Sequence, residues 1–390
     1  MSYNVNLACG QFTLKVKRSD LALEELLGFA SRSNPKRGFL FVSKVLGKHI
    51  PCTPSKMREI YNILAQKVGV SSLPTLVFGM AETAIGLGAG VADSLALYNG
   101  QKRGQTIFHQ STRHQIADPL FLTFDEIHSH APDQLVYSPH SDLYKDYVKC
   151  KRIVLVDDEI TSGRTLTELA RHLLAKLHQI NEDNLVEELV YVSIVSWLSD
   201  EQKQYLCDLL PVRLRFEEIL EGTFEFIAHP DFKPNLPGQV KAHAAPLGPR
   251  KDLGRQSLDM MFRQQNISLI EKSLNELILD ERQAISVIGM GEFSYQAFLL
   301  AEILEKRGFQ VKYHSTTRSP ILLGGAIQNS LQFEDEHGEG VTNYLHNPPT
   351  IDQQIILAFE SELCKKQSKL KEVLELHFVD QNSIQTWSHP

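Results

Sequence analysis

The five cysteines of the sequence are an odd number, and no two of them form a C-x-x-C pair. This pattern favours reduced thiols and argues against a disulfide framework or a zinc site. No apolar run approaches the ~18 residues of a membrane-spanning helix, and the N-terminal M-S-Y-N-V-N lacks a signal-peptide pattern. The net charge of −7 excludes a global basic field for nucleic acid. We therefore expect a cytoplasmic protein that acts on small molecules, with no nucleic-acid or membrane partner.

The length of the chain and its distribution of prolines predict two domains. A chain of 390 residues is long for one domain of ~100 to 200 residues, and with 42% apolar residues each half can bury a core. Several prolines and glycines fall between residues 229 and 255, a composition that resists both helix and strand. We place a first domain at residues 1–230, a linker at 231–256 and a second domain at 257–390.

The stretch from Arg152 to Thr165, R-I-V-L-V-D-D-E-I-T-S-G-R-T, combines a strand pattern with a cluster of polar residues. Its apolar run, Ile153 to Val156, is typical of a strand buried on both faces of a parallel sheet. Two carboxylates, Asp157 and Asp158, follow this run, and leucines recur at helical spacing after residue 165. Between the acids and the predicted helix lies a loop of small and hydroxyl-bearing residues, which includes Thr161, Ser162, Gly163, Arg164 and Thr165.

This junction of strand and helix suits a sugar phosphate. A loop of Thr, Ser and Gly lets several backbone N–H groups converge on one anion, and the helix adds the positive end of its dipole. A pair of ionised Asp side chains accepts hydrogen bonds from vicinal ribose hydroxyls and favours positive charge on the sugar ring. The alternative is a strand end with a helix cap, because Thr165-x-x-Glu168 also fits a capping box.

These residues resemble the signature of the type I phosphoribosyltransferases, in which an apolar strand, two acids and two variable residues precede a [Thr/Asp]-[Thr/Ser]-Gly-x-Thr loop. The resemblance implies an α/β fold with a parallel sheet flanked by helices and a hood, and it implies phosphoribosyl pyrophosphate (PRPP) and Mg²⁺ as ligands. Asp157 and Asp158 would hold the ribose hydroxyls and lie near Mg²⁺, directly or through water, while residues 161–165 would cradle the 5-phosphate. Thr161 stands where the purine-salvage branch has an Asp, so the similarity is to the orotate branch.

Cations interleave with a predicted strand, Phe39 to Val42, in the segment from residue 33 to 51. The preceding stretch, Leu21 to Ala30, has helical spacing. The interleaved pattern also fits a solvated edge strand, where lysines discourage sheet pairing. The resemblance implies an aromatic-rich hairpin that forms a hood over the base. It makes Lys44 a catalytic candidate and turns Lys48 and His49 toward the substrate or the pyrophosphate.

A helix is predicted at residues 55–68, and a second strand, loop and helix follow it. The strand is Thr75 to Phe78, and its loop belongs at the same carboxyl edge as the first loop, where α/β sheets bind ligands. Close helix packing is the alternative reason for small residues here. The carboxylate of Glu82 fits such a site only if it reaches Mg²⁺ or pairs with a lysine. The resemblance implies pyrophosphate binding through backbone amides at Met80, Ala81, Glu82, Thr83 and Ala84.

Four histidines lie around short strands predicted at Thr106 to Gln110 and Leu120 to Phe124, namely His114, His128, His130 and His140. A metal site is one interpretation, although H-S-H on an extended segment provides no third fixed ligand. The resemblance implies a mobile loop that closes over the reacting centre and excludes water. Arg113 and His130 are its candidates for neutralising pyrophosphate.

The alternation of strand and helix continues beyond the motif. A strand is predicted at Leu189 to Trp197 and a helix at Asp200 to Leu209. Residues 212–228 alternate in a way that predicts a hairpin at the sheet edge.

The second half of the sequence predicts a βαβ unit after a helical stretch, Phe262 to Leu279. A dinucleotide site is one interpretation of its Gly289-x-Gly291 turn, but Ser294 stands at the third glycine position and Tyr313-His314 replaces the ribose-binding acid. An anion site at the two strand ends fits better, with candidates Gly291, Thr316, Thr317, Arg318 and Ser319. The last four residues, W-S-H-P, match the beginning of an affinity tag.

The string T-R-S-P at residues 317–320 resembles the TRSP-domain proteins that accompany bacterial tellurite-resistance and stress gene clusters, as do N-P-K-R-G-F-L-F-V-S-K-V-L-G-K-H and H-S-H-A. The resemblance implies a smaller, Rossmann-like α/β TRSP domain behind an orotate-phosphoribosyltransferase-like domain, and a homodimer. We predict a glycosyltransferase that uses PRPP and Mg²⁺ to ribosylate a small, base-like acceptor and releases pyrophosphate, in the biosynthesis of a nucleoside-like metabolite. The alternatives are a non-catalytic PRPP-binding regulatory protein and a nicotinamide-dependent enzyme.

Overall fold

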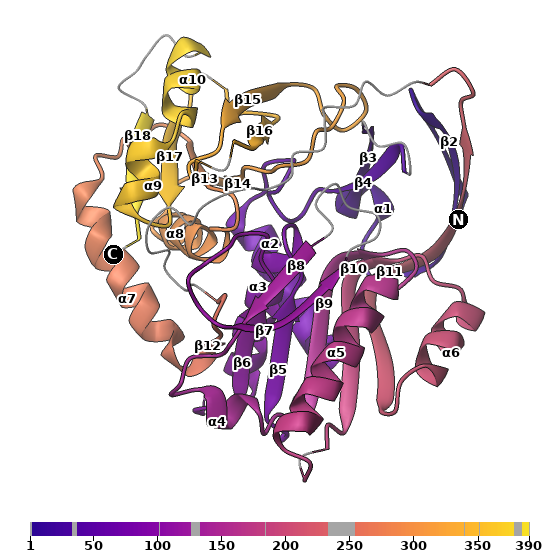
Figure 1. Cartoon of the computed structure of the whole chain (residues 1–390). Helices are drawn as coiled ribbons and strands as arrows, with labels where there is room; N and C mark the ends of the chain where they lie inside the picture. The colour runs from indigo at the N-terminus through magenta and orange to yellow at the C-terminus, as the bar shows by residue number, and fades with distance from the viewer. Residues whose placement is uncertain are drawn as a thin grey trace.

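The computed structural model in Figure 1 describes residues 2–32, 37–100, 102–125, 133–183, 185–232, 254–338, 340–350, 352–377 and 384–389. Most of the predicted linker, residues 233–253, lies outside this description, as do His128 and His130. The described residues form a mixed α/β fold with one large, mainly parallel sheet and four smaller sheets. The predicted fold class is therefore confirmed. No helix in these ranges is long and apolar enough to cross a membrane.

Eight strands form the large sheet. Its five central strands run parallel, and antiparallel strands flank them at both ends. In spatial order the strands are β1 (Ser2–Leu7), β2 (Gly10–Ser19), β11 (Arg213–Ala228), β10 (Glu188–Ser196), β9 (Arg152–Ile160), β5 (Thr75–Gly79), β6 (Thr106–Gln110) and β12 (Leu258–Asp259). The predicted strands β5, β6, β9 and β10 are confirmed, as expected for fully buried apolar runs.

The strand order reverses between β5 and β9. From β5 the chain passes through α3 (Ala84–Tyr98) to β6 on one side, and from β9 it passes through α5 (Arg164–Ile180) to β10 on the other. Because such crossovers are right-handed, α3 and α5 cover opposite faces of the sheet, with α5 in front in Figure 1. The loops that follow β5 and β9 then border a crevice at the carboxyl edge, the place where open α/β sheets bind ligands.

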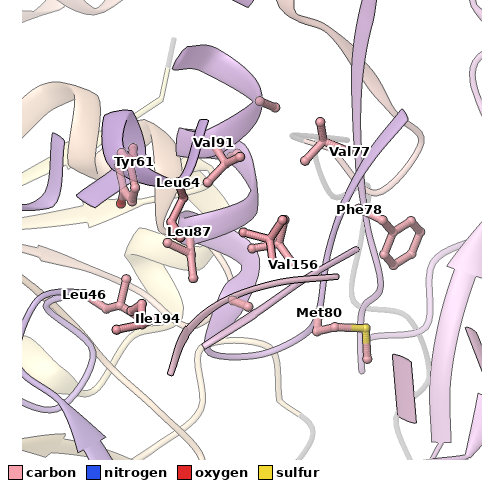
Figure 2. Close-up of a cluster of buried hydrophobic side chains, with 14 of the residues drawn as sticks. Leu46, Tyr61, Leu64, Val77, Phe78, Met80, Leu87, Val91, Val156 and Ile194 are labelled. Atoms are coloured by element: carbon pink, nitrogen blue, oxygen red, sulfur yellow. The ribbon is translucent and has the colours of Figure 1, made fainter. Parts of the chain in front are cut away.

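Helix α2 (Pro54–Val68) packs beside α3 over the same face of the sheet. Gly90 permits this close approach, because a Cβ atom there would lie 2.2 Å from Cδ2 of Tyr61. Figure 2 shows the buried side chains at this layer. They include Tyr61 and Leu64 of α2, Leu87 and Val91 of α3, and Val77, Phe78, Val156 and Ile194 of the sheet, all of them no more than 1% exposed.

A separate hairpin of β3 (Leu27–Ser31) and β4 (Phe39–Ser43) stands at the carboxyl edge. Its Phe39 and Phe41 pack on Phe12 of β2, with ring centroids 4.7 and 5.3 Å apart. The helix predicted at Leu21 to Ala30 is wrong beyond its first turn: α1 spans only Leu23–Leu26, and the next five residues pair with β4. Tertiary pairing overrides the local helical spacing there.

The hairpin predicted at residues 212–228 is also wrong. The segment is one continuous strand, β11, which pairs in parallel with β10 along its first half and antiparallel with β2 along its second. A bulge at Glu221 and Gly222 bends the strand between these partners. Gly222 fits because a Cβ atom there would lie 2.6 Å from the carbonyl oxygen of Lys15.

The remaining elements of the first half surround the large sheet. Helix α6 is confirmed and begins with a capping box formed by Ser199 and Gln202. The hairpin of β7 and β8 follows β6, and the predicted strand at Leu120 to Phe124 is its first arm. These elements are α4 (Tyr144–Tyr147), α6 (Asp200–Asp208), β7 (Leu120–Asp125) and β8 (Asp133–Tyr137).

The second half contains a four-stranded parallel sheet in the order β14, β13, β17, β18. The predicted βαβ unit is confirmed as β13 (Ile285–Gly289), α8 (Tyr295–Lys306) and β14 (Val311–Ser315), whereas the preceding helix α7 ends earlier than expected. The other elements are η1 (Met260–Phe262), α7 (Arg263–Ser273), η2 (Leu274–Glu276), β15 (Ser330–Glu334), β16 (Thr342–His346), β17 (Gln354–Phe359), α9 (Glu362–Gln367), α10 (Leu370–His377) and β18 (Ile384–Ser388).

The C-terminal residues belong to this second sheet. Trp387 lies on β18, is 2% exposed, and its Nε1 donates to Ser273 Oγ at 2.8 Å. Residues 384–389 therefore take part in the fold, and the match of W-S-H-P to an affinity tag stays an interpretation of the sequence.

The largest hydrophobic cluster spans both halves, and the second half has a further cluster of its own. Helix α8 packs on both α2 and α3, and a backbone bridge joins Cys52 of the first half to Tyr313 of β14. Buried ion pairs reinforce the contact, among them Arg58 of α2 with Glu302 of α8 at 2.7 Å. The carboxyl edge of the second sheet is thereby held against the crevice of the first.

Candidate active site

Asp157 and Asp158 lie near the carboxyl end of β9, where the strand order reverses. The pairing of β9 with β5 ends at Val156 and Gly79, while its pairing with β10 continues through Asp157. The two acids therefore border the crevice on the β5 side and are only partly buried. The backbone N–H of Asp158 donates to Asp157 Oδ1 at 3.0 Å.

The loop after β9 leads directly into α5. Gly163 is the residue before the helix, has φ 66° and provides no side-chain cap, and the amide of Arg164 donates to Ser162 Oγ at 3.5 Å. Thr165 thus lies inside the first turn, so the capping-box interpretation is wrong. A Cβ atom on Gly163 would lie 2.5 Å from Cδ1 of Leu206, which is a second reason for glycine. Amides at a helix start that lack a protein cap suit an anion.

The loop after β5 faces the same crevice through Ala81, Glu82 and Thr83. The peptide bond between Ala81 and Glu82 is cis. The backbone amides of Met80, Ala81 and Ala84 already donate, to Val156 O, Ser111 Oγ and Met80 O respectively. Met80 and Ala84 are buried and belong to the core. The direct contribution of this loop to a ligand therefore rests on its middle residues and not on the amides at its ends.

One pocket of about 260 Å³ joins these loops. It combines four acids with five arginines, a lining suited to a polyanionic ligand with a divalent cation. Its walls come from both halves of the chain, because the T-R-S-P string forms one side. The lining residues are Arg32, Arg37, Leu40, His49, Ala81, Glu82, Thr83, Arg113, Asp157, Asp158, Glu159, Ile160, Thr161, Ser162, Gly163, Arg164, Thr165, Leu166, Thr317, Arg318, Ser319 and Pro320.

The residues predicted to form an anion site in the second domain serve two different roles. Thr317, Arg318 and Ser319 line the common pocket. Gly291 and Thr316 lie behind it, where the amide of Gly291 donates to Thr316 Oγ1 at 2.7 Å and Thr316 is fully buried. These two residues hold the turn that positions the T-R-S-P string.

Two lysines lie elsewhere than expected. Lys44 Nζ donates to the carbonyl oxygen of Glu24 at 2.8 Å, and neither Lys44 nor Lys48 is among the described residues that line the pocket. Lys48 is 4% exposed and pairs with Glu82 at 2.6 Å, so the lysine partner expected for that acid is found. Lys48 Nζ also donates to the carbonyl oxygens of Thr316 and Gly291. Lys48 therefore joins the two halves behind the site, whereas His49 does line the pocket.

The surroundings of the site raise the pKa of one carboxyl group and lower the pKa of another carboxyl group and of a histidine. Burial, and then the charge of Glu159, raises the pKa of Asp158 to about 7. Burial opposes the ionisation of Glu82, but Lys48 outweighs it and lowers the pKa of that carboxyl. Burial, with His346 and Lys48 nearby, lowers the pKa of His49 well below its ordinary value, so His49 is neutral at physiological pH.

The histidine cluster considered as a metal site is not assembled in the described part of the chain. His114 is buried, within 3.0 Å of Arg318 Nη2 and 3.9 Å of Glu292 Oε1, while His140 is exposed. In the described ranges no three His, Cys, Asp or Glu side chains come together as a metal site. The role predicted for His130 falls on a residue outside those ranges.

Sequence reasoning missed several lining residues. Arg37 stacks over Phe39, with its Cζ atom 4.6 Å from the ring centroid, and its guanidinium pairs with Glu159. Arg32 Nε donates to the carbonyl oxygen of Arg37 at 2.9 Å. The signal in the sequence is weak: Arg32 and Arg37 precede an aromatic strand, and Glu159 follows the acid pair directly.

Two protein-family models match parts of the chain. A family model described as "Phosphoribosyl transferase" (PRTase_2) matches residues 26–223, and a second, described as "TRSP domain C terminus to PRTase_2", matches residues 253–376. None of the curated proteins matches the chain.

The chain is also similar to solved phosphoribosyltransferase structures at low identity. An adenine phosphoribosyl transferase from Trypanosoma brucei, in complex with AMP, pyrophosphate and ribose-5-phosphate, is 13% identical over 50% of this chain and 77% of its own, with a TM-score of 0.33. The adenine phosphoribosyltransferase from Thermoanaerobacter pseudethanolicus is 13% identical over 50% and 96%, with a TM-score of 0.30. The orotate phosphoribosyltransferase from Aeropyrum pernix is 15% identical over 47% and 80%, with a TM-score of 0.25.

The first family model spans just over half of the sequence and includes both loops of the crevice. The chain therefore belongs to the phosphoribosyl transferase family and carries a TRSP domain at the C-terminal side of its transferase domain.

Proposed function

We propose that the protein transfers the phosphoribosyl group of PRPP to a small, base-like acceptor and releases pyrophosphate. In this reaction the bond between ribose C1 and a pyrophosphate oxygen breaks, and the oxygen keeps the electron pair. A bond forms between C1 and a nitrogen of the acceptor, and the proton of that nitrogen passes to solvent or to a nearby base. The observation that carries the proposal is the single pocket onto which the acid pair, the amide-lined loop and the Glu82 loop all open.

We assign a part of PRPP to each group of residues that lines the pocket. The first turn of α5, with residues 161–165, suits the 5-phosphate because its N-cap residue, Gly163, has no side chain to occupy the helix start. Asp157 and Asp158 suit the ribose hydroxyls, since an ionised carboxylate only accepts hydrogen bonds. We assign the pyrophosphate to the loop at Ala81 to Thr83 and to Arg113, which line the same pocket. We assign acceptor binding to the side of the pocket next to the hairpin of β3 and β4, near Leu40 and His49.

The donor set also fits Mg²⁺. This ion takes oxygen ligands and is commonly held by one or two carboxylates together with substrate phosphates. Asp157 and Asp158 provide carboxylate oxygens on the pocket wall, and a cation beside Asp158 would favour the ionised form that burial and Glu159 disfavour. When bound, Mg²⁺ supplies Lewis-acid stabilisation of the leaving pyrophosphate. The protein residues hold the sugar and its two phosphorylated ends in place.

Replacement of the acids tests the proposal. Asp157→Asn and Asp158→Asn should each lower pyrophosphate release from PRPP, in the presence of a cell metabolite extract, on the order of 10²-fold. Asp142→Asn changes an exposed acid and is the matched control, expected to leave release unchanged. Mass spectrometry of the extract should reveal a new phosphoribosylated compound. Unchanged turnover in both acid variants would remove the assignment, and binding of PRPP without its consumption would favour a regulatory protein.

A further inference from the structure

The T-R-S-P string of the second domain is fixed on both sides before it reaches the pocket. Thr317 forms a bridge with Tyr344 of β16, with N–H to carbonyl distances of 3.0 and 2.7 Å. His346 Nε2 lies 2.9 Å from the carbonyl oxygen of Ser319. Arg318, between these two anchors, lines the pocket with its side chain. The backbone thus holds this arginine at the site independently of any ligand.

His114 of the first domain orients the guanidinium of Arg318. The Nη2 atom of Arg318 lies 3.0 Å from His114 Nδ1 and 3.4 Å from its Nε2, so the guanidinium packs against the edge of the ring. The Nε2 atom also faces Glu292 Oε1 at 3.9 Å. His114 is 2% exposed, so this contact is buried between the two halves. The contact crosses from one domain to the other.

Arg113 reaches the same corner of the pocket from the first domain. Its backbone N–H donates to Glu292 Oε1 at 3.0 Å, so one buried acid of the second domain organises both Arg113 and His114. Arg113 and Arg318 both stabilise the ionised form of Glu82, after the larger contribution of Lys48. The two arginines therefore lie close to the loop at Ala81 to Thr83, and both line the pocket there.

We propose that Arg318 contacts the pyrophosphate group of PRPP together with Arg113, so that the TRSP domain completes the active site of the transferase domain. The inference deepens the proposed function and rests on it. Negative charge grows on the pyrophosphate oxygen as the bond to ribose C1 breaks, and a preorganised cation stabilises that state more than the ground state. The planar guanidinium also binds two phosphate oxygens at once, which an ammonium group does not.

Three ligands separate the role of Arg318 from that of the rest of the pocket. Calorimetric titrations with Mg²⁺ would use PRPP, inorganic pyrophosphate and ribose 5-phosphate on the full-length protein. Arg318→Ala should weaken binding of PRPP and pyrophosphate by about 10- to 100-fold, the value of a hydrogen bond to a charged group. Its affinity for ribose 5-phosphate should stay at the wild-type value. Arg282→Ala, which removes an exposed arginine of the second domain, should change none of the three.

A conservative variant distinguishes the loss of the arginine contact from a general loss of structure. Arg318→Lys keeps the charge and the aliphatic stem, and it should recover part of the pyrophosphate affinity while the melting temperature stays near that of wild type. Wild-type pyrophosphate affinity in Arg318→Ala would overturn the inference, as would an equal loss for ribose 5-phosphate. Failure of the wild-type protein to bind PRPP at all would instead remove the proposed function itself.

Discussion

Lys48 Nζ and Glu82 Oε1 lie 2.6 Å apart and form the ion pair that connects the pocket loop after β5 to the second domain. The same ammonium donates to the carbonyl oxygen of Thr316 at 2.7 Å, one residue before the T-R-S-P string. Lys48 is 4% exposed, so the ion pair is buried and solvent would not compensate the charge of Glu82 in place of the lysine. A single lysine therefore fixes a transferase loop and the second-domain segment that faces it.

Removal of this lysine should destabilise the protein strongly. Lys48→Met would leave the Glu82 carboxylate buried beside two carbonyl oxygens that have lost their donor, at a cost of about 3–5 kcal/mol. The double variant with Glu82→Gln should regain part of that loss, because the uncompensated charge is gone. Lys312→Met removes an exposed lysine from β14 and serves as the control. Scanning calorimetry would compare the melting temperatures, and equal values for Lys48→Met and the control would contradict the prediction.

Gly163 should be sensitive to the addition of a single methyl group. Its φ of 66° costs a residue with a side chain about 1–2 kcal/mol, and the new Cβ atom would meet Leu206. Gly163→Ala should therefore shift the first turn of α5. It should weaken ribose 5-phosphate binding by about tenfold, which corresponds to the loss of one hydrogen bond from a backbone amide to a charged group.

Gly100 provides the matched control for this substitution. It has φ 82°, and a Cβ atom there would meet nothing within 4 Å. Gly100→Ala should lose similar stability in denaturant unfolding but keep full affinity in titrations with ribose 5-phosphate. If both alanine variants bind ribose 5-phosphate as well as wild type does, α5 does not form the phosphate site.

The local part of the site was predictable from the sequence, and the part made by distant residues was not. The run Ile153 to Val156, the acid pair and the loop before α5 are contiguous, so their order alone places them at a sheet edge. Glu82 and Lys48 were each noticed, but their pairing depends on how two loops fold against the second domain. Arg318 lies more than 150 residues from the acid pair, and no periodicity connects the two.

The errors in secondary structure have the same origin. The stretch from Leu21 to Ala30 has helical spacing, yet from Leu27 onward pairing with β4 decides the conformation. Strand β11 alternates like a hairpin, yet the bulge at Gly222 lets it continue with a new partner. Trp387 looks like part of a tag in the sequence, and only the register of β18 against β17 shows that it packs inside. In each case a long-range contact outweighs the local pattern.

The pH dependence of ligand binding should report the state of Asp158. Burial and the charge of Glu159 raise its pKa to about 7, whereas an unfolded Asp ionises near 3.9. The folded protein therefore holds a proton that the unfolded chain has lost between about pH 4 and pH 7, and folding stability falls as the pH rises through that window. Mg²⁺ and PRPP favour the ionised carboxylate, so their binding should release this proton below about pH 7.

The apparent affinity for PRPP with Mg²⁺ should consequently rise about tenfold from pH 6 to pH 8, as the ionised fraction of Asp158 increases. Calorimetric titrations in two buffers of different ionisation enthalpy would count the protons released. In Asp158→Asn the affinity should be lower overall, and the component of the rise due to this carboxyl should vanish. An identical slope in the variant and the wild type would assign the whole effect to the phosphates of PRPP, because they titrate in the same range.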